Sequence, residues 1–231
     1  MVGRWLVMAV GVCLGCLGPA WAVVYDLNAD VSANGGWPAA APSVGTWSAG
    51  SSQALGSFAP YDVYLGTEAT VWHTEAYLGQ SYNTANANVG HITPHTYFNN
   101  GTVKQVAENT WDGSNYTVYS IIRWTAPEAG PATVDVTFGD LGATKVDAWV
   151  LVNGSTLFSQ GAAEPETDIV TGILNTSVAV GDTIDLVIKR AAGQDGSHAG
   201  DTLMDAEINV VPEPASLAIL ALGGLFLRRR S

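Results

Sequence analysis

Apolar and polar residues alternate with a period of two through most of the middle of the chain. In residues 133–138, two valines and a phenylalanine alternate with threonine and aspartate, and residues 183–188 and 204–210 repeat the alternation. A period of two is typical of a β-strand that buries one face, whereas an amphipathic helix repeats every 3.6 residues. The pattern therefore predicts strands that share one core.

Other segments have the composition of strands bounded by turn residues. Residues 145–152 are apolar on nearly both faces, which is typical of a central strand, and Asn153-Gly154 indicates a tight hairpin turn. Residues 32–57 are rich in Gly, Ala, Ser and Pro and are predicted to be surface loops, and no long helix is expected in the body. The remaining predicted strands are residues 23–27, 61–65, 70–78, 102–107, 116–124 and 178–180. About eight to ten short strands predict one antiparallel β-sandwich.

The first 22 residues have the composition of a secretory signal. Arg4 gives a positively charged start, residues 5–17 form an apolar core, and Ala20-Trp21-Ala22 is a small-x-small cleavage site. These features predict a signal peptide with Ala20 and Ala22 at the cleavage site and a cut after Ala22. Residues 1–22 are therefore excluded from the fold.

Both cysteines lie in this N-terminal segment. Cys16 follows Leu14-Gly15, which resembles a lipobox, and a lipoprotein would instead be cut before Cys16. Against this alternative, Cys13 stands where a lipobox normally carries leucine, and the A-x-A site lies just downstream. The body, residues 23–211, has no cysteine, so its core rather than disulfides must stabilise it.

The last twenty residues combine a proline-containing motif, an apolar run and a basic end. Residues 215–227 would span about 20 Å as a helix, against roughly 30 Å of bilayer hydrocarbon. The arginines that follow are expected to stay on the cytoplasmic side, which places the body outside. Because proline excludes helix, the motif before the run is expected to be extended and accessible. The residues of this signal are Pro212, Glu213, Pro214, Arg228, Arg229 and Arg230.

This arrangement resembles the PEP-CTERM sorting signal of diderm bacteria. The resemblance implies that an exosortase, a membrane transpeptidase-like enzyme, recognises Pro-Glu-Pro and removes the tail. It also implies anchoring through the C-terminus before processing, and the cell surface or extracellular matrix as the destination. An ordinary C-terminal anchor with a proline-containing link is the alternative. The chain then divides into a signal peptide (1–22), a β-sandwich (23–211) and a sorting signal (212–231).

The body is strongly acidic. Residues 23–211 contain 20 of the 21 acidic residues but only five of the nine basic ones, for a net charge of about −15. Such a body cannot neutralise phosphates, which excludes nucleic acid as a partner. The charge favours cations as partners or serves solubility outside the cell.

A second resemblance concerns the body. Residues 116–127, YTVYSIIRWTAP, resemble a segment that is common in planctomycete-type PEP-CTERM proteins. The similarity continues through residues 150–158, 180–185 and 201–206. Such bodies look like the jelly rolls of carbohydrate-binding modules. The resemblance therefore implies a jelly-roll-like antiparallel β-sandwich with its first and last strands side by side.

The sequence shows no catalytic constellation. The H-E-x-x-H, G-x-S-x-G and Walker patterns do not occur, and Pro94 argues against one helix carrying both His91 and His95. His73 and Glu75 share a predicted strand face, where a surface hydrogen bond is the simpler explanation. The paired carboxylates of a glycosidase are a spatial feature, so that alternative stays open. We expect a protein that is not an enzyme.

One loop has the composition of a sugar-binding surface. Sugars stack on exposed aromatic faces while nearby polar side chains bond their hydroxyls. Trp111 lies among turn residues with Asp112 and Asn115 close by, so these three are candidate ligand-binding residues. The alternative is that Trp111 caps the end of the sandwich. Trp124 and Trp149 lie within strands and are expected in the core.

A structural calcium ion is the one cofactor that the sequence indicates. Calcium prefers oxygen ligands, and jelly-roll carbohydrate-binding modules often hold it near their terminal strands. Asp26 lies at the end of the first strand, while Asp201 and Asp205 flank the start of the last strand. The three carboxylates converge if those strands pair. Solvated turn aspartates are the alternative.

The leading hypothesis is an exported, non-catalytic protein of the cell surface or extracellular matrix that binds polysaccharide. Its processing partners would be signal peptidase and an exosortase-type enzyme. One alternative is a ligand-free structural surface protein whose acidic body supplies charge and hydration. The other is a glycan hydrolase or lyase on a β-sandwich. A glycan array with and without calcium separates the first two hypotheses, and turnover of polysaccharide would establish the third.

Overall fold

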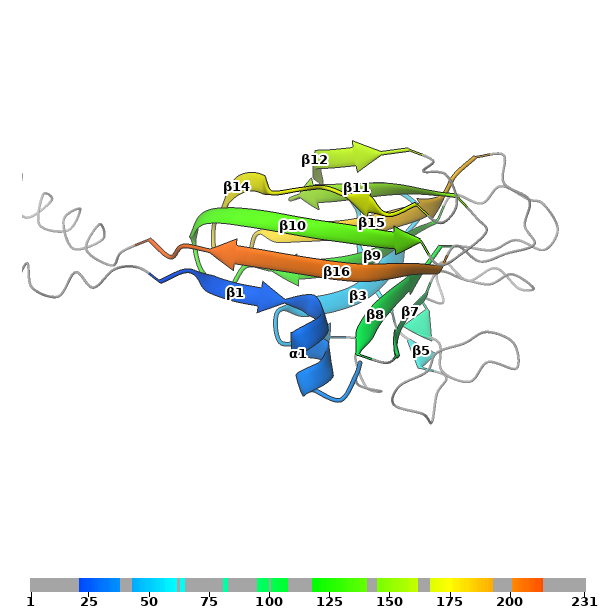
Figure 1. Ribbon diagram of the computed structural model, residues 1–231, viewed down its shortest axis with the longest axis horizontal. Coiled ribbons are helices and arrows are strands. Elements are labelled where there is room, and N and C mark those ends of the chain that lie inside the picture. Colours follow the sequence, from blue (N-terminus) through cyan, green and yellow to red (C-terminus); the bar gives the residue numbers. More distant parts are fainter. Residues whose placement is uncertain are drawn as a thin grey trace, which may run out of the picture.

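In the part of the chain that the structure describes, two antiparallel sheets face each other, with one short helix beside them (Figure 1). The computed structural model describes residues 21–37, 43–61, 63–64, 81–82, 95–99, 101–107, 118–140, 145–161, 167–192 and 201–213. The period-two pattern predicted an all-β sandwich, and this fold class is confirmed.

The first sheet, sheet A, has the order β13-β10-β16-β8-β7, with β1 also paired to β16 and β14 to β10. Its strands are β1 (Val23–Asp26), β7 (His95–Asn99), β8 (Thr102–Val106), β10 (Gly130–Asp140), β13 (Ile169–Val170), β14 (Leu174–Val178) and β16 (Asp201–Val210).

The second sheet, sheet B, has the order β12-β11-β15-β9-β3-β2, with β4 also paired to β3. Its strands are β2 (Ser43–Val44), β3 (Trp47–Ser52), β4 (Ala59–Pro60), β9 (Tyr119–Thr125), β11 (Val146–Val152), β12 (Ser155–Gln160) and β15 (Thr183–Arg190). A separate pair joins β5 (Val63–Tyr64) to β6 (Ser81–Tyr82).

Eight of these strands are connected as a jelly roll. In chain order they are β1, β9, β10, β11, β12, β14, β15 and β16. In sheet A they lie side by side in the order β1-β16-β10-β14, which are the first, eighth, third and sixth of the eight strands. In sheet B the order is β9-β15-β11-β12, which are the second, seventh, fourth and fifth. This order is that of two Greek keys folded into a double sheet. The expected pairing of the first and last strands is confirmed, with Val23 opposite Val210 and Asp26 opposite Glu207.

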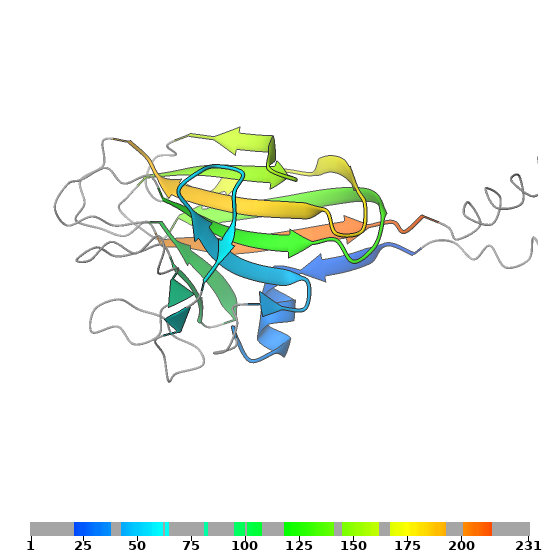
Figure 2. The ribbon, with the colours of Figure 1, turned by 180° about the vertical axis from the view of Figure 1, so that it is seen from behind.

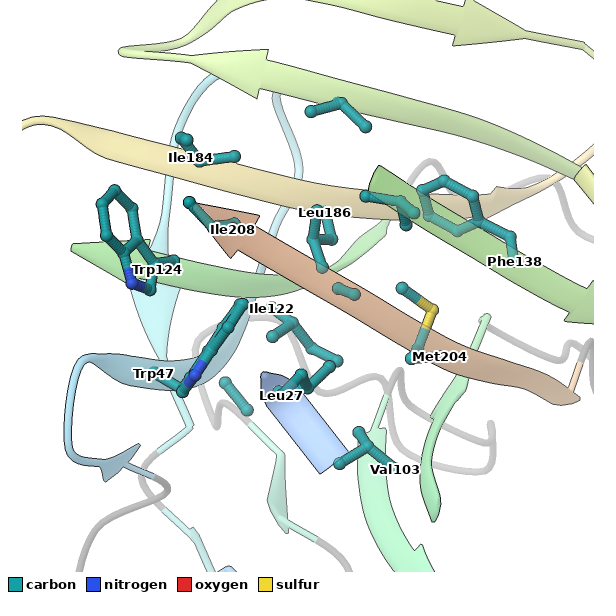
Figure 3. Packing of buried hydrophobic residues seen from close by; sticks show 14 of the residues in the cluster. Leu27, Trp47, Val103, Ile122, Trp124, Phe138, Ile184, Leu186, Met204 and Ile208 are labelled. Carbon is teal, nitrogen blue, oxygen red and sulfur yellow. The ribbon is translucent and has the colours of Figure 1, made fainter. Parts of the chain in front are cut away.

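The core lies between the two sheets and is built by their inward-facing side chains (Figure 3). Phe138 and Ile208 from sheet A meet Ile122, Trp124 and Leu186 from sheet B, and each is at most 1% exposed. Burying one such side chain stabilises the fold by about 1.5–3 kcal/mol, before the cost of ordering it. Because residues 23–211 contain no cysteine, this core rather than disulfides stabilises the sandwich.

A short helix, α1 (Leu27–Ala33), follows β1 directly and departs from the expected strand at residues 23–27. Asp26 caps it, because its carboxylate accepts a hydrogen bond from the backbone N–H of Ala29 at 2.9 Å. Leu27 and Val31 are buried and pack into the main core. Seven residues are too few for a helical period to show in the sequence.

One side chain of α1 completes the edge of sheet A. Between β1 and β8, the Asn28 Nδ2 donates to the backbone oxygen of Met204 at 3.0 Å, and Asn28 Oδ1 accepts from the N–H of Val103 at 2.7 Å. Asn28 thereby satisfies two part-buried backbone groups at the end of the β8–β16 pairing.

The prediction of loops for residues 32–57 is wrong in part, because β2 and β3 lie in that range. β3 pairs with β9, and its Trp47 and Ala49 are fully buried. The serines and glycine of β3 hid the strand, but the small residues have a packing reason. A Cβ on Gly50 would overlap the Phe58 ring and the Ala59 carbonyl oxygen.

Most other predicted strands match the structure to within a few residues. Residues 102–107, 145–152 and 204–210 correspond to β8, β11 and β16. The hairpin turn at Asn153-Gly154 is confirmed, since both residues have positive φ, 49° and 77°, as a type I′ turn requires. The predicted strand at residues 70–78 lies outside the described residues.

Candidate ligand-binding face

The outward side of sheet B carries a second apolar cluster, separate from the core. Ile121 of β9, Leu151 of β11 and Val187 of β15 are at most 1% exposed, although they point away from sheet A. Side chains on the outer face of a sandwich normally meet water, so these three must be covered. The residues packed against them are Phe58, Tyr119 and Trp149.

The loop between β3 and β4 lies over part of this face, and we call residues 53–58 the strap. Figure 2 shows this segment, in cyan, crossing in front of β15. Gly56 of the strap reaches the β11–β12 turn, where a Cβ on Gly56 would come within 3.0 Å of the Gly154 backbone oxygen. The strap therefore spans sheet B from β3 to the far hairpin.

A buried ion pair lies beneath the strap. The Arg123 guanidinium donates to both oxygens of Asp185, at 2.6 and 2.8 Å, and its Cζ lies 4.2 Å from the centroid of the Phe58 ring. The Asp185 side chain is fully buried, while that of Arg123 is 21% exposed. Two charge-assisted bonds and a cation–π contact thus join β9, β15 and the strap.

Two aromatic side chains lie on the same face beyond the strap. Tyr119 and Trp149 are half-buried, with ring centroids 5.6 Å apart and ring planes at 74°. The Lys189 Nζ lies 5.8 Å from the Tyr119 ring centroid and 3.7 Å from Asp147 Oδ2. The Lys189 and Asp147 side chains are 23% and 19% exposed. We call these four residues, from three neighbouring strands, the aromatic patch.

The aromatic patch has the groups that contact with a sugar requires. The C–H face of a sugar ring packs on an aromatic face, while an ammonium donates to hydroxyl oxygens and a carboxylate accepts from hydroxyls. The Lys189–Asp147 pair is partly exposed and contributes about 0–1 kcal/mol to stability, so a ligand can replace the contact at low cost. Because the ring planes of Tyr119 and Trp149 are steeply inclined to each other, they suit a twisted polysaccharide chain better than a flat polysaccharide surface.

The sequence did not single out the aromatic patch. Trp149 was expected in the core together with Trp124, and this is wrong for Trp149, which lies on the outer face of β11. Trp124 is fully buried, as expected. Asp147 and Lys189 do carry a sequence signal, because each is a polar residue at the outward position of an apolar strand. The predicted platform of Trp111, Asp112 and Asn115 lies outside the described residues.

The structure pairs the strands that the calcium hypothesis requires, but two of the carboxylates have other contacts. Asp26 Oδ1 caps α1, and Asp205 Oδ1 accepts from Asn28 Nδ2 at 3.3 Å. The side chain of Asp201 is not among those described. Within the described part of the chain, no three His, Cys, Asp or Glu side chains are grouped as a metal site. Calcium at Asp26, Asp201 and Asp205 stays a prediction.

The start of the predicted sorting signal lies at the end of the β10–β16 pairing in sheet A. β16 ends at Val210, before Pro212, as expected. Glu213 is exposed, also as expected, but its backbone N–H donates to the Ala129 carbonyl at 3.1 Å. The accessibility expected of the motif is therefore confirmed at Glu213, whereas the pairing of its backbone with the sandwich was not predicted. Pro214 and the segment with Arg228, Arg229 and Arg230 lie outside the described residues, as does Ala20, whereas Ala22 is exposed.

Comparison with known protein families identifies the C-terminal signal. Residues 210–231 match the PEP-CTERM protein-sorting motif. The chain therefore carries a signal for export and C-terminal sorting, and this motif implies processing by exosortase. In the described residues, α1 is too short to cross a bilayer and no other helix is long and apolar enough to do so. The predicted helix after Pro214 lies beyond them.

Solved structures that resemble the chain include carbohydrate-binding modules. A family 35 module from an environmental isolate is 15% identical, with 72% of this chain and 98% of that chain covered and a TM-score of 0.29. A family 35 module from Clostridium thermocellum is 14% identical, covering 51% and 98%, with a TM-score of 0.28. A family 29 module is 9% identical, covering 62% and 86%, with a TM-score of 0.30. At these scores the fold rests on the strand pairing itself. No curated protein matches the sequence.

Proposed function

We propose that this chain is an exported, non-catalytic protein of the cell surface or extracellular matrix that binds polysaccharide through the aromatic patch. The observation that carries the proposal is the pair Tyr119 and Trp149, half-buried beside Lys189 and Asp147 on one sheet face. Both rings pack with part of their surface on the apolar cluster beneath them and leave the rest exposed. Contact with a sugar ring would remove this remaining apolar surface from water.

The sorting signal supports the location in this proposal. A protein sent to the envelope meets polysaccharide there, and its acidic body keeps it soluble. Before processing, the apolar run after Pro214 would hold the chain at the membrane, and exosortase would then transfer it to the surface or release it. A structural calcium ion at Asp26, Asp201 and Asp205 remains part of the proposal.

A glycan array with the full-length chain in detergent tests binding, with and without calcium. Trp149→Ala should weaken binding about tenfold or more, which is the usual effect of removing a central aromatic anchor. Trp149→Phe keeps a ring in place and should retain most of the binding. Ile173→Ala, on the β13–β14 connection, truncates an exposed apolar side chain (68% exposed) away from the aromatic patch and should change nothing.

Each alternative function gives a distinct result in this experiment. If no glycan binds to the wild-type chain, the body is a ligand-free structural protein. Release of shorter sugars from a bound polysaccharide would make it a glycan hydrolase or lyase. If glycans bind and Trp149→Ala binds them as well as wild type, the site lies elsewhere, and the Trp111, Asp112 and Asn115 loop becomes the next candidate.

A further inference from the structure

The backbone that leads into Pro-Glu-Pro continues to pair with β10 after β16 has ended. The Val211 N–H donates to the Pro131 carbonyl at 2.9 Å, and the Glu213 N–H donates to the Ala129 carbonyl at 3.1 Å. We call residues 211–213 the stem and residues 129–131 the dock. The stem keeps the β10–β16 register, in which Ala132 lies opposite Val210.

This register explains how a proline fits into the paired segment. Opposite residues of an antiparallel pair alternate between hydrogen-bonded and non-hydrogen-bonded positions. Val211 and Glu213 fall at hydrogen-bonded positions, so Pro212 between them falls at a position where no N–H is required. The proline that ends the regular strand thus leaves the docking of Glu213 intact.

One residue of the dock must be a glycine for the stem to lie where it does. Gly130 lies opposite Pro212, and a Cβ on Gly130 would overlap the Val211 carbonyl oxygen and approach Pro212 Cα to 3.4 Å. Any side chain at residue 130 would push the stem off the sheet. The stem is therefore held by two backbone hydrogen bonds and by the close approach that this glycine allows.

We propose that residues 129–131 position the sorting motif and restrain its processing, so that the stem must leave the dock before the sorting enzyme takes hold of the chain. Enzymes that act on peptide bonds commonly bind their substrate as an extended strand through its backbone groups. In the docked stem, the N–H groups of Val211 and Glu213 are already used by the sandwich. The exposed Glu213 side chain remains readable, whereas the Glu213 N–H is not. This inference rests on processing of the motif and is independent of sugar binding.

The test compares two glycine substitutions in the full-length chain, produced in a host with its sorting enzyme. Gly130→Ala removes the space for the stem, while Gly161→Ala is the matched control, since its Cβ would meet only Asp147 Oδ1 at an ordinary 3.5 Å. Each of the two stem hydrogen bonds restrains undocking by about two- to tenfold, and Gly130→Ala removes both. Tail removal, followed by pulse–chase labelling, should therefore speed up at least about fourfold in Gly130→Ala and not in Gly161→Ala.

Hydrogen exchange of the same chains in detergent reports the docking directly. The amides of Val211 and Glu213 should be protected in wild type and in Gly161→Ala but not in Gly130→Ala, with β15 amides unchanged as evidence of folding. Val211→Pro removes one stem donor and puts the proline Cδ where its hydrogen pointed at the Pro131 oxygen, so it should also undock the stem and speed processing without a change at Gly130, which covers a failure of Gly130→Ala to fold. Unprotected stem amides in wild type, or undocked variants processed at or below the wild-type rate, would overturn the proposal.

Discussion

The ion pair beneath the strap is expected to be the most sensitive polar contact in sheet B. Asp185→Ala removes a fully buried carboxylate and leaves the Arg123 guanidinium against Phe58 without its counter-charge. Breaking a fully buried pair in this way costs about 3–5 kcal/mol. Because Arg123 is 21% exposed, water can solvate part of the guanidinium, and we expect a loss of about 2–4 kcal/mol.

The double variant Arg123→Met/Asp185→Leu separates the charge from the packing. It replaces both charged groups with apolar side chains of similar length, so no unpaired charge remains, and it should recover at least half of the loss seen in Asp185→Ala. Urea unfolding followed by tryptophan fluorescence gives the free energy of unfolding for each variant, and an unchanged m-value supports a two-state comparison.

Two results would contradict this reasoning. A loss below about 1 kcal/mol in Asp185→Ala would place the pair among ordinary surface ion pairs, despite the complete burial of Asp185. A double variant as unstable as Asp185→Ala would show that the charge is not the cause. The lost packing of the strap against Arg123 would then explain the destabilisation.

Three further predictions concern burial. Trp124→Ala should lower the unfolding free energy by about 3–5 kcal/mol because Trp124 is fully buried, whereas Trp149→Ala should cost clearly less; urea titration decides, and equal losses would place both in the core. Thr202→Val should be neutral or stabilising by up to about 1 kcal/mol, because the buried Oγ1 has no hydrogen-bond partner among the described residues; a clear loss in thermal unfolding would reveal a bound water there. The free energy of unfolding should fall as the pH rises above about 10, because two tyrosines have raised pKa values. Burial, and then the hydrogen bond to Glu128, raise the pKa of Tyr25 to about 12. Burial also raises the pKa of Tyr61. Both phenols favour folding while protonated, so the contribution is complete below pH 10 and is lost toward pH 12; a flat stability curve over that range contradicts the burial of Tyr61.

The strands that the sequence predicted well are those in which buried and exposed residues alternate along the strand itself. In β10 and β16 one face is core and the other is solvent, so alternation along the chain reports the fold directly. β3 was missed because its packing against Phe58 requires small residues, and small residues also make loops. Helix α1 was missed because its stability comes from the Asp26 cap and from two buried side chains, in only seven residues.

The candidate site depends on pairings that a single sequence does not show. Tyr119, Trp149 and Lys189 come from strands far apart in the chain, and only the order β11-β15-β9 places them in one patch. The part of the outer face of sheet B that the strap covers was not predicted from the sequence either. Residues 145–152 are apolar on both faces because a strap from a distant loop packs on sheet B, and this made Trp149 look like a core residue.

The sequence by itself determined the class of fold, the run of most strands, the turn at Asn153-Gly154 and the sorting signal at the C-terminus. These features are set by local physics: the pleat of a strand, the positive φ of a turn, and the order of motif, apolar run and arginines. Tertiary structure alone decided which faces stay open, that Asp185 is buried with Arg123, and that the stem pairs with residues 129–131. Each of these depends on register and close approach between segments far apart in the chain, which are fixed only when the two sheets close on their common core.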